Sequence, residues 1–323
     1  INNEMLIDAW NGHSVSTDSA SIYLEAGKDY QLQAEYYDNR DYAIAKLQWK
    51  VPQIGKATRL DLYGEAGKAV RECETVVAVM GINKSIEREG QDRYGIELPA
   101  DQREFLREIY QVNPNIILVL VAGSSLAVNW ENEHLPAIVN AWYPGEQGGT
   151  AVAEVLFGDY NPAGRLPLTY YKSLEELPPF DDYDITKGRT YQYFKKDVLY
   201  PFGYGLSYTT FKYSNLEVTD AGKTVNVSFT LKNTGKRAGD EVVQVYVKLP
   251  EVAGGTQAIK QLKGFQRVAL KAGESRKVEI TVDKEQLRYW DEKQTCFVVP
   301  QGSFTFMVGA SSNDIRLENT TNL

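Results

Sequence analysis

Apolar and polar residues follow three different patterns in succession along the chain. Up to about residue 55 they alternate, in the runs 21–27, 30–37 and 45–51, as they do in strands with one buried face. Between residues 75 and 157 continuous apolar runs alternate with stretches of helical spacing. From residue 211 alternation returns, with turn residues between the runs. The sequence therefore predicts an all-β segment, an α/β region and a second all-β region.

The middle region has the pattern of a mainly parallel sheet with flanking helices. The runs 75–80 and 115–122 are apolar throughout, as parallel strands buried on both faces are, and 137–142 is a third strand candidate. Residues 99–110 begin with proline and then space their apolar residues as a helix does, and 148–157 repeats a helical pattern. This order favours an α/β fold class.

The last part of the chain predicts an antiparallel β-sandwich. Alternating runs at 224–231, 241–249, 277–282 and 303–308 are separated by turns, with no long helical segment among them. We therefore divide the chain into a β segment (1–55), an incomplete α/β domain (56–180), a linker rich in proline and glycine (181–210) and a sandwich (211–323).

Composition excludes several classes of protein. The chain has 323 residues, with 35 Lys and Arg against 43 Asp and Glu, for a net charge of −8, so neither nucleic acid nor an anionic membrane is an expected partner. The longest strongly apolar run, 116–122, is too short to span a bilayer. Two cysteines are too few for a disulfide scaffold or a cysteine metal site. There is no initiator methionine, and the first residues resemble the middle of a fold, so we expect one part of a longer protein.

The loop after the first parallel strand concentrates charge. Glu87, Arg88, Glu89, Asp92 and Arg93 lie within seven residues. Ligands of open α/β sheets gather at the carboxyl ends of strands, which is where this loop begins. The same residues also fit a solvated, mutually neutralised surface run, so both interpretations stay open at this point.

Two other clusters carry weaker signals. Residues 143–149 are rich in glycine before a helix but lack the spacing of a phosphate loop, so tight packing between strand and helix is the better interpretation. Ser124 and Ser125 follow a strand without the surrounding glycines of a nucleophile elbow, and only His13 and His134 are available as a base. With two histidines a zinc site is not expected either.

Three stretches resemble the C-terminal half of glycoside hydrolase family 3. They are Gly81–Pro99, Ala141–Pro167 and Tyr200–Phe211. The resemblance extends from about residue 60 to the end of the chain. Residues 1–55 resemble the tail of a carbohydrate-binding β-sandwich insert of the anthrax-protective-antigen kind, and the last domain is similar to a fibronectin type III-like sandwich.

The resemblance implies a β-glucosidase or β-xylosidase that releases terminal residues from β-linked oligosaccharides or glycosides. Such enzymes carry an Asp nucleophile on a barrel domain and an acid/base Glu on the α/β sandwich. No barrel occurs in this sequence, so the resemblance implies a barrel-bearing polypeptide as a partner. It also implies a retaining double displacement with no metal or organic cofactor. For an enzyme that degrades polysaccharides we expect export to the periplasm or the cell exterior.

The family's acid/base motif, a Glu-Gly pair shortly before Asp-Arg, matches Glu89 to Arg93. The resemblance thus implies Glu89 as the acid/base, with Glu87 in reserve. Because a nearby cation favours the ionised carboxylate, we expect Arg93 to pair with Asp92 and Arg88 to point away from Glu89. A non-catalytic carbohydrate-binding or scaffolding module is the alternative function.

Overall fold

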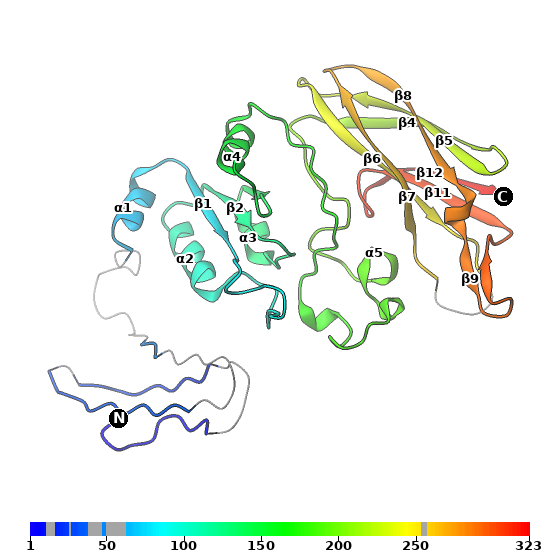
Figure 1. Cartoon of the computed structure of the whole chain (residues 1–323). Coiled ribbons are helices and arrows are strands. Elements are labelled where there is room, and N and C mark those ends of the chain that lie inside the picture. The colour runs from blue at the N-terminus through cyan, green and yellow to red at the C-terminus, as the bar shows by residue number, and fades with distance from the viewer. Residues whose placement is uncertain (11–16, 26, 38–46, 50–62, 253–256) are drawn as a thin grey trace. The chain divides into compact units, whose positions relative to one another are not determined.

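The structure is a computed structural model of the chain, and it describes residues 1–10, 17–25, 27–37, 47–49, 63–252 and 257–323. Contacts between residues divide the chain into two compact units, Ile1–Thr58 and Arg59–Leu323 (Figure 1). In the described parts no helix has the length and apolarity needed to cross a membrane.

The N-terminal unit differs from the strands that its alternation predicts. The structure assigns no strand to its described residues, so the strands expected at 21–27 and 30–37 are wrong there, and most of the run 45–51 lies outside the described residues. Tyr23, Leu32 and Tyr36 are exposed. Alternation specifies one apolar face, but strands form a stable sheet only when a partner covers that face. The assignment of residues 1–55 to an insert remains a prediction.

The second unit begins with the predicted α/β arrangement, and that part of the fold class is confirmed. Its strands β1 (Val76–Gly81), β2 (Ile116–Val121) and β3 (Ala137–Asn140) form a parallel sheet in the order β1-β2-β3. The helices are α1 (Glu65–Glu72), α2 (Ala100–Tyr110), α3 (Asn129–His134), α4 (Gly148–Phe157) and the single turn α5 (Thr190–Tyr193).

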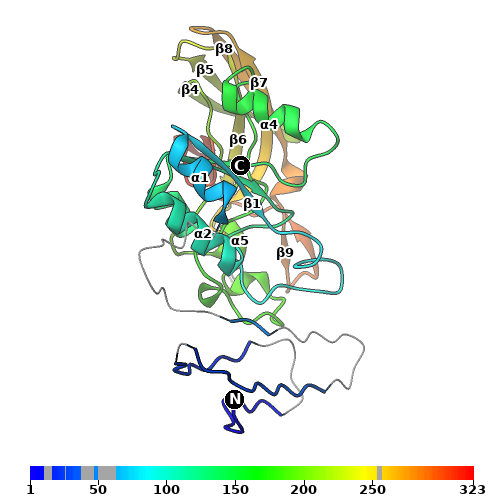
Figure 2. The same cartoon turned by 90° about the vertical axis from the view of Figure 1, so that its left-hand side faces the viewer.

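One face of this sheet packs against α1 and α2 (Figures 1 and 2). Val70 of α1 and Leu106 of α2 join Ala78 and Leu118 in one apolar core. The register sets Val76 beside Ile116, so the carboxyl ends of the parallel strands lie at one edge. Three loops therefore leave that edge together, 82–99 after β1, 122–128 after β2 and 141–147 after β3.

The predicted sandwich is also confirmed. One sheet has the order β12-β11-β6-β7 and the other the order β4-β5-β8, all antiparallel (Figure 1). Their bounds are β4 Phe211–Asp220, β5 Thr224–Asn233, β6 Gly239–Lys248, β7 Gln261–Leu270, β8 Ser275–Asp283, β11 Ser303–Gly309 and β12 Ile315–Asn322, with a hairpin of β9 Tyr289–Asp291 and β10 Cys296–Val298. Alternate residues of facing strands, such as Val227, Phe229 and Val245, fill the core between the sheets.

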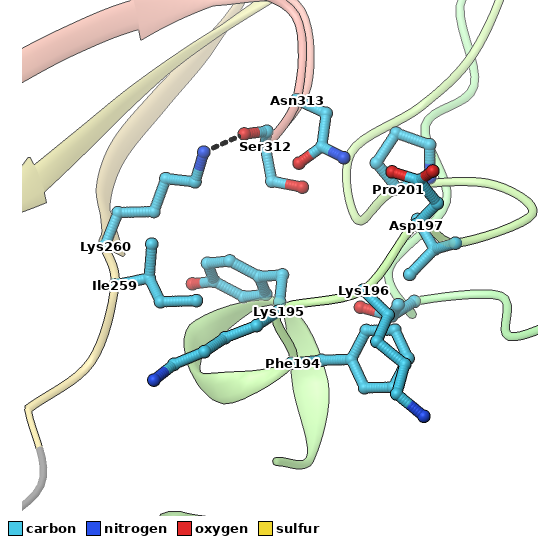
Figure 3. Close-up of a pocket in the computed structure, with 12 residues that line it drawn as sticks. Phe194, Lys195, Lys196, Asp197, Pro201, Ile259, Lys260, Ser312 and Asn313 are labelled. Atoms are coloured by element: carbon cyan, nitrogen blue, oxygen red, sulfur yellow. Dashed lines mark hydrogen bonds between the residues drawn. The ribbon is translucent and has the colours of Figure 1, made fainter. Parts of the chain in front are cut away.

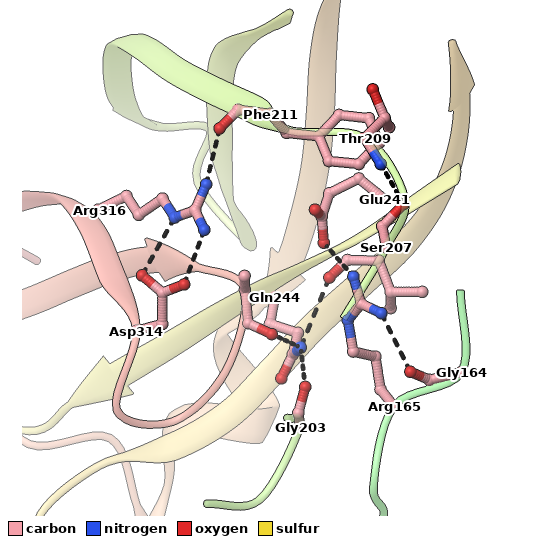
Figure 4. Close-up of polar contacts among 12 residues, drawn as sticks. Gly164, Arg165, Gly203, Ser207, Thr209, Phe211, Glu241, Gln244, Asp314 and Arg316 are labelled. Carbon is pink, nitrogen blue, oxygen red and sulfur yellow. Dashed lines mark hydrogen bonds and ion pairs between the residues drawn. The ribbon is translucent and has the colours of Figure 1, made fainter. Parts of the chain in front are cut away.

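Buried polar contacts join the sandwich to the segment 164–205 (Figure 4). The Arg165 guanidinium donates to the Glu241 carboxylate over 2.8 Å, and their side chains are only 8% and 4% exposed. The Gln244 amide of β6 donates to the carbonyl oxygen of Gly203 over 3.1 Å and to that of Ala310 over 2.6 Å. These contacts explain one glycine of the stretch Tyr200–Phe211 that resembles the family. Gly203 has φ +83°, and a Cβ there would lie 2.0 Å from the Gln244 Oε1.

Replacing Glu241 by Ala tests the buried ion pair. The substitution leaves the Arg165 guanidinium charged and unpaired in the interior, so we expect the free energy of unfolding to fall by about 3–5 kcal/mol. The matched control is Glu217→Ala, which removes an exposed partner of Lys277 at 3.6 Å and should cost about 0–1 kcal/mol. Denaturant unfolding of both variants measures the difference. Equal losses would show that the Arg165 pair does not stabilise the junction.

Candidate active site

Glu89 lies at the tip of a tight hairpin in the loop after β1. The backbone N–H of Arg88 donates to the carbonyl oxygen of Gln91 over 3.1 Å, and the N–H of Gln91 donates back over 3.0 Å. Glu89 and Gly90 are the two residues between them, and Gly90 has φ +75°, a conformation that glycine adopts at the third position of a type II turn. The Glu89 side chain is exposed, and among the described residues it has no hydrogen-bond or ion-pair partner.

An ion pair at the base of the hairpin fixes its position. The Arg93 Nε lies 2.5 Å from a Glu87 carboxylate oxygen. The Arg93 Nη2 donates to the Ser124 Oγ over 2.8 Å and to the Ser125 carbonyl oxygen over 3.0 Å. The Ser124 hydroxyl donates in turn to Glu87 over 2.7 Å. We call Glu87, Arg93 and Ser124 the clamp, because they join the loop after β1 to the loop after β2.

The clamp corrects one expectation about charge pairing. Arg93 pairs with Glu87 and not with Asp92, which is exposed. The physical reason is burial, since the Arg93 side chain is only 10% exposed and its partners Glu87 and Ser124 are partly buried. Glu87 is therefore occupied by two donors, whereas neither arginine forms an ion pair with Glu89.

The third loop joins the same edge. The Tyr143 hydroxyl donates to the carbonyl oxygen of Ile82 over 3.4 Å. The Tyr143 ring lies so close to Gly123 that a Cβ at that position would be 2.4 Å from it. The N–H of Ala127 donates to the carbonyl oxygen of Ile96 over 2.8 Å. The three loops thus form one connected surface at the carboxyl edge of the sheet.

Aromatic rings accompany Glu89 on these loops. Tyr94 and Tyr143 are both exposed, as sugar-stacking rings must be, while Trp142 is half-buried. Trp142 has φ +55°, an unfavourable conformation for a residue with a Cβ. Residues with such a backbone conformation persist only where the surrounding structure fixes them, and they cluster at active sites.

The weaker candidates take structural roles. Ser124 is part of the clamp, and the His134 Nδ1–H donates to the Trp130 carbonyl oxygen over 2.7 Å, so these two do not form a triad. His13 lies outside the described residues. In the glycine-rich loop, a Cβ on Gly148 would lie 2.4 Å from the Cβ of Pro144, so glycine allows the loop to turn tightly into α4. Within the described ranges no three His, Cys, Asp or Glu side chains gather as a metal site would need.

The sequence patterns gave no indication of α3 and its buried carboxylate. Glu131 is 3% exposed, and burial raises the pKa of its carboxyl, although Arg107 and Arg103 oppose that shift. Six residues are too few to show a clear helical period. The only available signal of this helix was the polar stretch between the second and third strands.

Comparison with known proteins identifies the family. Residues 8–208 match the glycosyl hydrolase family 3 C-terminal domain, and residues 241–312 match a fibronectin type III-like domain. The chain therefore belongs to glycoside hydrolase family 3, which confirms the resemblance. The first match includes most of residues 1–55, so it does not separate an insert from the domain that follows.

Relatives and solved structures agree with this assignment. A xylan 1,4-beta-xylosidase of Xylanibacter ruminicola is 42% identical over an alignment of 310 positions, and the match covers 92% of this chain and 35% of that protein. The beta-glucosidase BoGH3A of Bacteroides ovatus is 35% identical over 313 aligned positions, and the match covers 88% of this chain and 42% of that protein. The crystal structure of a Bifidobacterium adolescentis GH3 beta-glucosidase matches with a TM-score of 0.77 and 33% identity, over 84% of this chain and 42% of that chain.

Removing Arg93 tests whether the clamp holds the hairpin. In Arg93→Ala we expect amide hydrogen exchange at Arg88 and Gln91 to become about tenfold faster or more, because two backbone hydrogen bonds alone hold a hairpin weakly. Lys84→Ala, an exposed change in the same loop, is the matched control and should leave both amides unchanged. Amides of β5 serve as the internal reference for global stability. Unchanged exchange at Arg88 and Gln91 in Arg93→Ala would contradict the role of the clamp.

Proposed function

We propose that this chain supplies the acid/base of a retaining β-glycosidase that removes terminal β-D-glucosyl or β-D-xylosyl residues. The observation that carries the proposal is the exposed carboxylate of Glu89, which has no hydrogen-bond or ion-pair partner in the described part of the chain and sits on a clamped turn at the carboxyl edge of the sheet. The names of relatives as beta-glucosidases and a beta-xylosidase support the substrate class.

The chemistry favours Glu89 over Glu87. In the first step of a double displacement the acid/base protonates the leaving oxygen, and in the second it deprotonates a water molecule. Both steps need a carboxyl that reaches the glycosidic oxygen and exchanges its proton. The Glu87 carboxylate is paired with Arg93 and accepts from Ser124, and it would lose the ion pair with Arg93 if it moved to a substrate. Glu89 has no such ion pair or hydrogen bond with a described residue to give up.

The other half of the reaction requires a second carboxylate. In retaining glycosidases the two carboxyl groups lie about 5–5.5 Å apart, with the sugar between them. We propose that an Asp on a barrel domain outside these 323 residues attacks the anomeric carbon. The chain spans 35% and 42% of the length of the two curated relatives described above, which leaves room for such a domain in a full-length protein.

Replacing Glu89 by Gln in the full-length protein tests the proton donor. The amide cannot protonate the leaving oxygen, so the rate on an alkyl β-glycoside should fall by about 10²–10⁴-fold. The first step on a dinitrophenyl β-glycoside should fall much less, because that leaving group departs without a proton. The values of kcat/KM on both substrates give the ratio, because kcat/KM reports the first step even where the second step limits kcat.

Glu87→Gln is the matched control for this ratio. It removes a carboxylate two residues away. Because this carboxylate helps to position the turn, its loss should lower the rates on both substrates by a similar factor. If Glu89→Gln lost equal activity on both substrates while Glu87→Gln discriminated between them, the acid/base would be Glu87.

The split site makes a separate prediction for the 323-residue chain by itself. Without a nucleophile it should give no turnover of an aryl β-glucoside or an aryl β-xyloside, whereas the full-length protein should hydrolyse at least one of them. A chromogenic assay at equal molar concentrations decides between these outcomes. Turnover by the chain alone, abolished by Glu89→Gln, would show that the nucleophile lies within it.

A further inference from the structure

α1 and α2 cover one face of the parallel sheet (Figures 1 and 2), and the other face is uncovered over β1. Val77 and Val79 alternate with the core residue Ala78, so they lie on this other face, where they are 46% and 62% exposed. On the neighbouring strand the same face is covered, because Val119, the register partner of Val79, is 1% exposed. Parallel sheets are normally covered on both faces. β1 therefore presents an apolar surface that is suited to burial under another element.

β1 is also an edge strand of the sheet. The N–H of Val76 donates to the Asn115 carbonyl oxygen over 3.0 Å, so the backbone groups of Val76 point toward β2. Backbone groups of successive residues alternate in direction, so those of Val77 and Val79 point to the free edge. Among the described residues none pairs with them. A free, apolar edge is a template for a further strand, and folded proteins normally cover it.

Gln102 of α2 sets the end of this free edge. Its side-chain amide accepts from the Gly81 N–H over 2.9 Å and donates to the Gly81 carbonyl oxygen over 2.9 Å. The amide thus forms both hydrogen bonds that a neighbouring strand would form at that residue. A strand added to this edge can therefore pair with Val77 and Val79, and its pairing stops before the loop that leaves β1.

The handedness of the connections indicates what covers the open face. α1 leads into β1 and α2 leads out of it, and both helices lie on the same face of the sheet. Connections between parallel strands are right-handed, so their helices change face only where the order of the strands reverses. A helix over Val77 and Val79 therefore belongs to a unit whose strands continue from the free edge of β1, away from β2. Strand order reverses at β1 in such a sheet.

We propose that a strand and a helix from the part of the full-length protein outside these 323 residues complete the sheet at β1. The strand lies parallel to β1 and pairs with Val77 and Val79, and the helix buries both side chains. This chain matches 35% and 42% of the length of the two curated relatives described above. Most of each relative therefore lies outside the match, and the corresponding part of this protein can supply such a unit.

A second copy of this chain fits the surface less well. Two copies related by a two-fold axis would pair their β1 edges antiparallel. Their open faces would then lie side by side, and Val77 and Val79 of both copies would stay exposed. A strand and helix from outside the 323 residues satisfy the free edge and the open face together.

The completed sheet gives a reason for the place of the loop 82–99, which carries Glu89. Ligands of open α/β sheets bind at the carboxyl ends of the strands where the strand order reverses. This loop leaves β1 at that end. The added unit would then form one wall of the crevice that the loop borders. The proposal rests on the geometry of the sheet, and it holds whether or not Glu89 is the acid/base.

Residue-resolved hydrogen exchange on the full-length protein tests the pairing. The amides of Ala78 and Met80 point toward β2 and serve as the reference within the same strand. With a strand on the free edge, the amides of Val77 and Val79 should exchange within about tenfold of these two. Faster exchange than that at Val77 and Val79 would overturn the proposal. Glu89→Gln should change none of these rates, so the result is independent of any loss of hydrolysis.

Photocrosslinking in the full-length protein identifies the occupant. Photoleucine, a photoactivatable analogue of leucine, is placed at Val79, and mass spectrometry locates the residue that it joins. The expected partner lies in the same polypeptide, outside the 323 residues. Phe265, 68% exposed on the edge strand β7, is the matched control and should give no link to that segment. A link from Val79 to residues 1–62 or to a second copy, or no link at all, would overturn the proposal.

Discussion

The presentation of Glu89 depends on one ion pair, between the Arg93 guanidinium and the Glu87 carboxylate. The pair lies at the base of a two-residue turn, and the Ser124 hydroxyl closes the network from the next loop of the sheet. A turn of this kind has only two backbone hydrogen bonds of its own. The side-chain clamp therefore converts a weak hairpin into a fixed support, and it leaves the carboxylate at the tip free for chemistry.

A second buried network gives the rest of the unit its rigidity. Arg165 with Glu241, and Gln244 with Gly203, connect the segment after α4 to strand β6 of the sandwich. The N–H of Ile259 donates to the Gln192 carbonyl oxygen, and the N–H of Ser312 donates to that of Phe202, along the same junction (Figure 3). The sandwich thus holds the segment that precedes it through several separate contacts.

Sequence patterns predicted the strands well where a strand's own residues are apolar throughout. The apolar runs at 75–80 and 115–122 became β1 and β2 within a residue or two, because a short run that is apolar throughout marks a strand of a parallel sheet. The expected burial on both faces holds for β2 but not for β1, where Val77 and Val79 are exposed. The alternation at 30–37 failed, because it says nothing about which surface covers the apolar face. Local proximity likewise suggested Asp92 for Arg93, whereas the actual contacts come from Glu87 and from Ser124, 31 positions away. Glu89 itself came from the family motif.

An acid/base role requires the Glu89 carboxylate to lie at the glycosidic bond of a bound substrate. A crystal structure of the full-length protein with an unhydrolysed thioglycoside measures this position directly. We expect a Glu89 carboxylate oxygen within about 3–3.5 Å of the glycosidic sulfur, with the carboxylate of the nucleophile about 5–5.5 Å from that of Glu89. A Glu89 side chain in bulk solvent, with Glu87 or another acid beside the glycosidic sulfur, would contradict it.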